Sequence, residues 1–222
     1  MGGDSLIKVF IDYYDLFLVG LLGTLKLSLI AVFFGLIIGT LIAILHLSKN
    51  KILQGFAKVY VEVLRGTPLL VQIYLVYFFL PMAFPILANI SKDTSVIVAL
   101  LLNSSAYVSE VVRGGINSVD KGQTEAARSL GMSANNCMFK IVLPQAVKNI
   151  LPALGNEFIT MVKETSIAAV FMVNELMYVR MILANKFIMW QPIIIIALIY
   201  LVVNIILSQL VGLMERRLSV SD

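Results

Sequence analysis

The chain has 222 residues, of which 59% are apolar and 14% charged, whereas ordinary soluble domains have about 45–50% apolar and about 25% charged residues. This composition excludes an ordinary soluble domain and indicates a protein embedded in the lipid bilayer. The single cysteine, Cys137, excludes an internal disulfide, and with His46 as the one histidine no metal site is expected. Basic loops that face anionic lipid explain the net charge of +4, so nucleic acid is not expected as a partner.

Four long runs without Asp, Glu, Lys or Arg predict membrane-spanning helices, because about 20 mostly apolar residues cross the hydrocarbon core. A fifth apolar region, residues 150–172, is interrupted by charged residues. By itself it could be a cytoplasmic helix or a span that carries functional charge. We predict an all-α membrane protein that forms one domain over residues 1–222. Its five spans are expected at about residues 16–47, 58–80, 94–113, 150–172 and 188–213.

The first span, residues 16–47, has no basic region before it and no small-residue cleavage site after it. It is also longer than the apolar part of a signal peptide, so we expect it to be retained. The mature chain is expected to start at Asp4 or earlier.

Polar residues inside the second and third spans mark positions that rarely face lipid. Pro68 removes a helix hydrogen bond and is expected to bend the second span towards a cavity near Gln72. In the third span Asn103 and Ser104 fall near the middle of the membrane, and Tyr107 lies one turn further in. These side chains could face a pathway or could hydrogen-bond neighbouring helices.

Charged residues near the membrane surface are expected to form ion pairs. Glu110 and Arg113, three residues apart, predict one pair at the cytoplasmic side of the third span. Glu62 and Arg65 predict a second pair in the same way. Glu157 could pair with Lys148 or Arg113 instead of contacting a substrate.

The long cytoplasmic loop, residues 114–149, is predicted to form two short helices. Thr124 is expected to cap the first helix, Gly131 to end it with a positive φ, and Ser133 to cap the second, which is expected to end at Pro144. The small residues Ala126 and Ala127 would allow close approach to a groove on a soluble partner. The alternative, from these residues alone, is an ordinary surface loop.

The fourth predicted span along the chain, residues 150–172, carries acidic residues on one face. Glu157 and Glu164 are seven residues apart, which is two helical turns, and Thr160 and Met161 lie between them. Lys163 points elsewhere. Charges within a span usually face a bundle interior or an aqueous cavity, so we expect Glu164, near the middle of the membrane, to contact a substrate.

The distribution of basic residues selects the orientation of the five spans. An N-terminus outside and a C-terminus in the cytoplasm place eleven Lys and Arg inside and five outside, as the positive-inside rule favours. The expected cytoplasmic residues are Lys49, Lys51, Lys58, Arg65, Arg113, Lys121, Arg128, Lys140, Lys148, Arg216 and Arg217. The expected exterior residues are Lys8, Lys26, Lys92, Arg180 and Lys186.

The cytoplasmic loop contains a motif with a characteristic spacing. It consists of Glu125-Ala126-Ala127, three residues, Gly131, nine residues, Ile141, one residue and Leu143-Pro144. This run resembles, in its complete spacing, the EAA signature of permease subunits of bacterial ABC importers. Three further stretches resemble the branch that transports polar amino acids, so the likeness covers about residues 16–214. They are YVEVLRGTPLLVQ at residues 60–72, AYVSEVVRGGI at residues 106–116 and LPALGNEF at residues 151–158.

The resemblance implies the type I ABC importer permease fold in a bacterial cell (inner) membrane. It also implies a second permease subunit, an ATP-binding cassette ATPase subunit, and an extracytoplasmic binding protein that delivers a polar amino acid. The loop would then couple to the ATPase through Glu125, Ala126, Ala127, Arg128 and Gly131. This chain has no G-x-x-x-x-G-K-[ST] run, so ATP and Mg²⁺ are expected on the partner, and this chain is expected to have no cofactor and no enzymatic activity.

The acids within the spans outnumber the bases there by one, which favours a basic amino acid such as arginine, lysine or histidine. A full EAA loop and a polar layer in one chain favour a homodimer. The alternative function is a channel or gated pore subunit without an ATPase. An intramembrane enzyme is disfavoured because the spans offer no pairing of a nucleophile with a base. The expected substrate-binding residues are Glu164, Glu157, Thr160, Met161, Asn103, Ser104, Tyr107 and Gln72.

Overall fold

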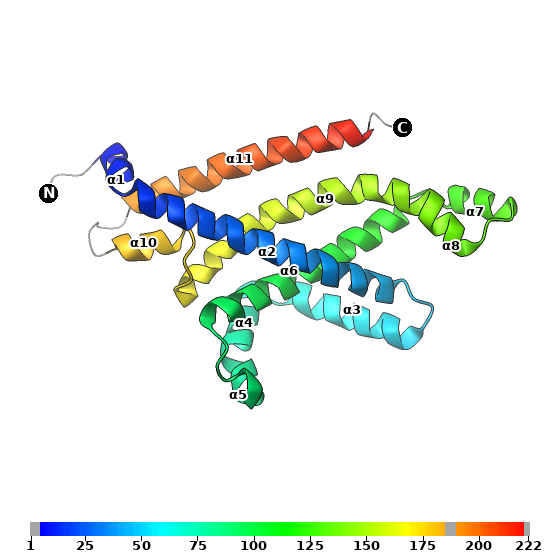
Figure 1. Cartoon of the computed structure of the whole chain (residues 1–222), viewed down its shortest axis with the longest axis horizontal. Helices are drawn as coiled ribbons and strands as arrows, with labels where there is room; N and C mark the ends of the chain where they lie inside the picture. Colours follow the sequence, from blue (N-terminus) through cyan, green and yellow to red (C-terminus); the bar gives the residue numbers. More distant parts are fainter. Residues whose placement is uncertain (1–4, 185–189, 220–222) are drawn as a thin grey trace.

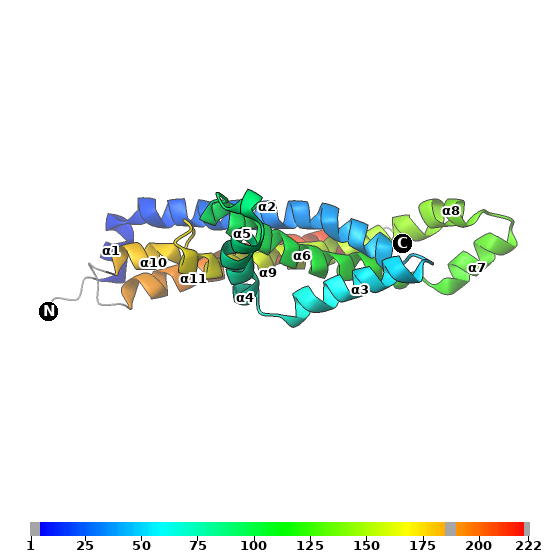
Figure 2. The same cartoon turned by 90° about the horizontal axis from the view of Figure 1, so that it is seen from below.

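The computed structural model describes residues 5–184 and 190–219. All regular elements in these ranges are helices, as the composition predicted. The long helices form an elongated bundle, with α1 (Leu6–Asp12) at one end and α7 (Lys121–Ser129) at the other (Figures 1 and 2). Asp4, Lys186 and the first residues of the expected last span lie outside the described residues.

Four helical stretches in the described residues are long and apolar enough to cross a membrane. They are α2 (Tyr14–His46), α6 (Lys92–Asn117), the run Ala134–Phe171, and α11 (Gln191–Ser219). A bent pair of helices, Lys51–Gly66 and Leu69–Ala83, can supply the fifth span. The structure therefore offers four spans, or the five that the sequence predicted if the bent pair counts as one span. The orientation in the membrane stays a prediction.

The expected second span, residues 58–80, is not one continuous helix. α3 (Lys51–Gly66) and the helix that begins with α4 (Leu69–Tyr74) meet at an angle of 108°. The break falls at Thr67, which is extended (φ −119°, ψ 144°), because the Pro68 ring disfavours helical geometry in the residue before it. The chain then continues through η1 (Leu75–Phe79), α5 (Leu80–Ala83) and η2 (Pro85–Leu87). Pro68 thus separates two helices instead of kinking one.

Long helices extend into both ends of the predicted loop, residues 114–149. α6 continues to Asn117, and the second short helix, α8 (Ala134–Cys137), runs on through η3 (Met138–Val142) into α9 (Leu143–Glu164). The expected end of this helix at Pro144 is wrong. Pro144 lies in the first turn of α9, directly after the π-helical stretch η3, where the change of helix type accommodates its missing N–H.

Two of the three predicted caps in this region are confirmed. Gly131 has a φ of 85°, and Ser133 accepts a hydrogen bond from the N–H of Asn136 at 3.3 Å. The prediction for Thr124 is wrong, because this residue lies inside α7. Asp120 is the N-cap residue of α7, and its carboxylate accepts the backbone N–H two residues on at 2.6 Å.

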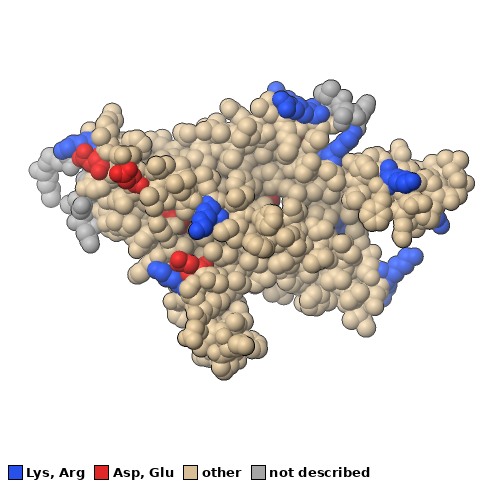
Figure 3. Space-filling view, in the orientation of Figure 1, with Lys and Arg blue, Asp and Glu red and all other residues tan. Residues whose placement is uncertain are grey.

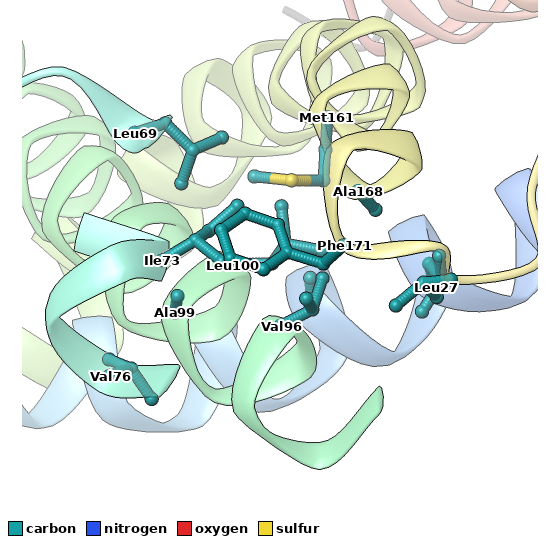
Figure 4. Close-up of a cluster of buried hydrophobic side chains, with 12 residues drawn as sticks. Leu27, Leu69, Ile73, Val76, Val96, Ala99, Leu100, Met161, Ala168 and Phe171 are labelled. Carbon is teal, nitrogen blue, oxygen red and sulfur yellow. The ribbon is translucent and has the colours of Figure 1, made fainter. Parts of the chain in front are cut away.

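The largest hydrophobic cluster lies where α2, α4, α6 and the end of α9 meet η4 (Thr165–Phe171). Figure 4 shows Leu100 of α6 beside Ile73 of α4 and Phe171 of η4, with the Met161 side chain of α9 pointing into the same cluster. This cluster holds the broken helix and α9 against α6, which positions the elements that line the site described below.

Glycines on α2 allow it to pack very closely against α6. A Cβ added to Gly35 would lie 2.9 Å from the Ser104 hydroxyl, and one added to Gly39 would lie 2.5 Å from the Ser105 carbonyl oxygen. Real Cβ atoms do not approach so closely, so these two positions require glycine. Close packing between membrane helices through small residues is typical of bundles that lack a hydrophobic driving force for association.

Most of the face seen in Figure 3 carries no Lys, Arg, Asp or Glu side chain, as expected for contact with lipid. On the face seen in Figure 3, acidic side chains gather towards the end that carries α1, and the charged side chains at the end that carries α7 and α8 are basic. α11 is the least covered of the long helices, with large exposed residues along its length, such as Leu198, Ile205 and Leu213.

Candidate functional site

A cavity of about 260 Å³ lies beside the break between α3 and α4. This volume is just below the range for small-molecule pockets, about 300–1,000 Å³. The break supplies one wall, α6 a second and α9 a third. The lining residues are Thr67, Pro68, Leu69, Asn103, Tyr107, Glu157, Thr160, Met161 and Glu164. Six of the eight side chains that the sequence suggested for a substrate site thus meet around one cavity, which we call the acidic pocket.

The other two suggested residues lie directly behind the pocket lining. Gln72 is buried and stabilises the helix break. Its Nε2 donates to the carbonyl oxygen of Leu64 at 2.7 Å and to that of Thr67 at 3.0 Å. Asn103 donates from Nδ2 to Gln72 Oε1 at 3.1 Å. The Asn103 amide N–H groups are therefore used inside the protein, and its carbonyl oxygen is the group left to face the pocket.

Ser104 is the second residue behind the lining. It is fully buried, and its hydroxyl donates to Glu157 Oε1 at 3.2 Å. Glu157 is only 8% exposed, so this hydrogen bond holds a carboxylate that has little access to water. The alternative pairing of Glu157 with Arg113 is not seen, because Arg113 donates to Glu110 from Nε at 2.9 Å and from a terminal nitrogen at 2.7 Å. The ion pair of Glu110 with Arg113 confirms the sequence prediction.

Thr160 and Glu164 border the pocket from α9, one and two turns beyond Glu157 respectively. Met161 is 1% exposed, and its side chain fills the hydrophobic cluster of Figure 4. It therefore bounds the pocket by packing and offers no polar group. Among the described residues that line the pocket, two are carboxylic acids and none is basic. The pocket is consequently suited to a cationic group.

The charges next to the pocket form a group that spans three helices. Besides Arg113, Glu110 lies 3.5 Å from a terminal nitrogen of Arg65 and 3.8 Å from Nδ1 of His46. The predicted pair between Glu62 and Arg65 is wrong. Glu62 lies 3.7 Å from Nζ of Lys58, one turn earlier on the exposed side of α3, while Arg65 turns towards α6.

The two short helices beyond α6 project from the end of the bundle (Figures 1 and 2). Ala127 is buried against Cys137 and Val142, so it holds α7 onto the following helix. Glu125, Ala126, Arg128 and Gly131 are exposed. Leu130 was not singled out from the sequence, yet it is 86% exposed, which leaves an apolar side chain at the tip of the projection.

Sequence reasoning also missed a buried carboxylate, Glu175, in the segment between η4 and α10 (Tyr178–Leu183). Glu175 is 0% exposed. It accepts hydrogen bonds from the N–H groups of Met177 at 2.8 Å and Tyr178 at 2.6 Å, and from the hydroxyl of Tyr200 at 3.1 Å. Burial raises the pKa of Glu175 to about 7, against the effect of these hydrogen bonds.

The segment around Glu175 docks onto α2 through glycines. A Cβ on Gly23 would lie 2.2 Å from the Asn174 carbonyl oxygen, and Thr24 accepts a hydrogen bond from the N–H of Leu176 at 3.0 Å. The sequence signal that could have revealed this contact is the pair Gly20 and Gly23 followed by Thr24, a small polar patch within an otherwise bulky apolar span.

Comparison with known proteins gives consistent results. Residues 16–220 match the model of the family described as binding-protein-dependent transport system inner membrane component. A protein of Rickettsia bellii, provisionally named as a glutamine transport system permease, is 42% identical over 203 residues, which cover 91% of this chain and 92% of that protein. The arginine transport system permease protein of Bacillus subtilis is 40% identical over 204 residues, again covering 91% and 92%.

Solved structures of ABC transporters contain chains with the same fold as this protein. A crystal structure of an amino acid ABC transporter with histidines has 46% sequence identity and a TM-score of 0.91, and the match covers 98% of this chain and 100% of that chain. An inward-facing methionine ABC transporter has 16% identity and a TM-score of 0.79, covering 93% and 98%. The second likeness shows the fold alone.

Proposed function

Since this chain belongs to the family of inner membrane components of binding-protein-dependent transport systems, and is an amino acid permease of the ABC importer type, we propose that it carries basic amino acids through the acidic pocket. The observation that carries this proposal is the pocket lining, which combines Glu157 and Glu164 with no basic side chain among the described residues. The family match also favours an importer over the alternative of a channel subunit without an ATPase.

The groups around the pocket match the parts of a basic amino acid. Every zwitterionic amino acid carries an ammonium group, which one carboxylate can bind, and a cationic side chain supplies a second positive charge for the other. Charge-assisted hydrogen bonds of this kind are stronger than those between neutral groups. The Asn103 carbonyl oxygen and the Thr160 hydroxyl add acceptors to the same wall. A substrate with a neutral side chain would leave one of the two pocket carboxylates without a positively charged partner.

We propose that α7 couples the pocket to a separate ATPase subunit. The exposed surface of Glu125, Ala126, Arg128, Leu130 and Gly131 supports this, since a projecting helix with small residues and one apolar tip fits a groove on a soluble partner. The uninterrupted helical connection from α8 through η3 to α9 would pass movement at this end to Glu157 and Glu164. ATP and Mg²⁺ would bind to that partner and not to this chain.

The remaining partners follow from the family. We propose that a second copy of this chain completes the pathway, that an extracytoplasmic binding protein delivers the amino acid, and that the assembly works by alternating access in a bacterial inner membrane. The pathway would run between the copies, with the acidic pocket of each copy opening towards it.

The proposal is tested by reconstituting the complex with its ATPase and binding protein in liposomes and measuring uptake of arginine, lysine, histidine and glutamine. Replacement of Glu164 by Gln removes a charge-assisted hydrogen bond, so arginine uptake should fall by about 10-fold or more. ATP hydrolysis without substrate should stay near the parent level, because Glu164 is far along α9 from α7. Uptake of glutamine in preference to arginine would contradict the basic substrate.

Glu62→Gln is the matched control for the Glu164 variant. It removes a carboxylate from the exposed side of α3, where Glu62 contacts only Lys58 among the ion pairs of the described residues. Arginine uptake should be unchanged in this control. Equal uptake by the Glu164→Gln variant and by the parent protein would remove Glu164 from the site.

A further inference from the structure

Arg65 links the acidic pocket to the group of charges beyond it. It lies in the last turn of α3, directly before the helix break. Its guanidinium carbon is 5.2 Å from the centre of the Tyr107 ring, a distance at which a cation is attracted by the face of an aromatic ring. The same guanidinium lies 3.5 Å from Glu110 Oε2. Tyr107 in turn lines the acidic pocket.

These contacts lie on one side of the pocket. Along α6, Asn103 and Tyr107 line the pocket, and Glu110 and Arg113 follow one and two turns later in the direction of α7. Arg65 therefore occupies the boundary between the pocket and the end of the bundle that carries the short helices. Arg65 itself does not line the pocket, so any role it has follows from this boundary position.

The contacts that Glu110 makes with Arg113 and with Arg65 differ in length and in exposure to water. Arg113 donates two short hydrogen bonds to Glu110, and both residues belong to α6. The contact between Arg65 and Glu110 is longer, joins two different helices, and involves an arginine side chain that is 42% exposed. Such a pair is weak and easily exchanged with water. The Glu110–Arg113 pair is thus a fixed anchor, and the Arg65 contact is the part that can open.

We propose that Arg65 is the positioning residue of a gate on the cytoplasmic side of the acidic pocket. Arg65 holds the Tyr107 ring against the pocket, and the anchored Glu110 holds Arg65, so the pocket is closed towards α7. Rotation of the Arg65 side chain away from Glu110 breaks the weak contact, frees Tyr107 and opens the pocket to the cytoplasm. This role rests on the proposed transport function, but the closed contact itself can be measured without transport.

The experiment measures access to the pocket from the cytoplasmic side. In a Cys137→Ser background, Thr160→Cys places a reporter thiol in the pocket lining. The complex with its ATPase is prepared in inside-out vesicles, and the rate of labelling by a cationic, membrane-impermeant methanethiosulfonate reagent is recorded. Adding Arg65→Gln or Glu110→Gln should raise this rate about fivefold, the factor expected for loss of a weak contact.

Two further variants sharpen the result. Arg65→Lys keeps the charge but loses the planar group that lies over the ring, so its labelling rate should rise less than that of Arg65→Gln. Glu62→Gln, on the exposed side of the same helix, should leave the rate unchanged. Unchanged rates in both Arg65→Gln and Glu110→Gln would overturn the gate.

Buried Cys137 separates gating from unfolding. In matched chains that keep Cys137 and lack the reporter, labelling of Cys137 should stay as slow as in the parent. Cys137 is buried against Ala127 of α7 and Val142 of η3. A rise at Cys137 as large as the rise at the reporter would also overturn the proposal, since it would show loss of structure. Failure of the parent complex to take up amino acids would refute the proposed function and leave the labelling result to stand on its own.

Discussion

At the scale of single residues, the site depends on side chains that do not touch the cavity. Gln72 satisfies backbone carbonyl groups that the helix break leaves without partners, and Ser104 gives the buried Glu157 a donor. Leaving a buried polar group unpaired costs about 1–3 kcal/mol. These two residues therefore stabilise the geometry that Glu157 and Asn103 present to a substrate.

Ser104→Ala should lower arginine uptake about 10-fold, because loss of one donor to a buried carboxylate is worth about 1.5 kcal/mol. The effect should appear in the concentration dependence of uptake by the reconstituted complex. Ser105→Ala is the matched control. Ser105 is equally buried on the same helix, but its hydroxyl interacts with Tyr60 at 2.6 Å. Equal losses in both variants would show that Ser104 acts only through helix packing.

At the scale of elements, the turn between α7 and α8 is the feature most clearly specified by its sequence. Leu130 is the C-cap residue of α7, Gly131 takes a positive φ, and Ser133 caps α8, all within four residues. Each of these choices satisfies a backbone group or a backbone angle locally. The position of α7 as a projecting helix depends on this turn.

Gly131→Val should impair uptake while the chain still inserts in the membrane. A side chain at φ 85° is strained by roughly 1–2 kcal/mol, although no atom lies within 4 Å of the added Cβ. The ratio of amino acid transported to ATP hydrolysed should therefore fall. Gly55→Val is the control, because an added Cβ there also meets nothing within 4 Å but the backbone is helical. A normal ratio in Gly131→Val would remove this turn from coupling.

At the scale of the whole molecule, α2 joins two segments that are far apart in the chain. Its first half packs on the Glu175 segment through Gly20 and Gly23, and its second half packs on α6 through Gly35 and Gly39. One helix therefore fixes both the segment between η4 and α10 and α6, which lines the acidic pocket. The contact of Thr24 with the Glu175 segment lies at the first of these two junctions.

Glu175 should make the stability of the folded chain depend on pH. Its pKa in the folded state, about 7, is above the ordinary value of 4.5, so the folded state binds more protons than the unfolded state between these values. Stability from this group is present below about pH 4.5 and is lost as the pH rises through about 7. The full change is on the order of 3 kcal/mol, because a difference of one in pKa between the two states corresponds to about 1.36 kcal/mol.

The measurement is the Tm of the purified chain in detergent between pH 5 and pH 8. The Tm of the parent should decline across this range, and Glu175→Gln should decline less because its amide does not titrate. The control Glu62→Gln should keep the parent slope. A slope that is the same in Glu175→Gln and in the parent would show that other groups dominate the pH dependence.

Local rules in the sequence predicted much of this structure. Apolar runs gave the spanning helices, and the helical repeat placed Glu157 and Glu164 on one face, where the structure has them lining one cavity. The spacing of Glu110 and Arg113 predicted their ion pair. These features depend on residues within two turns of each other, so their geometry follows from the backbone of a single helix.

What the sequence by itself determined is therefore the helical membrane fold, the family and the local motifs. Only the tertiary structure decided the 108° turn at Thr67, the turn of Arg65 away from Glu62 towards α6, and the burial of Glu175. Each of these depends on contacts between segments up to about 150 residues apart, such as that of Thr24 with Glu175. The physical reason is that local backbone preferences fix where a helix stops, while the direction of the next helix and the partners of its side chains are fixed by packing against distant helices.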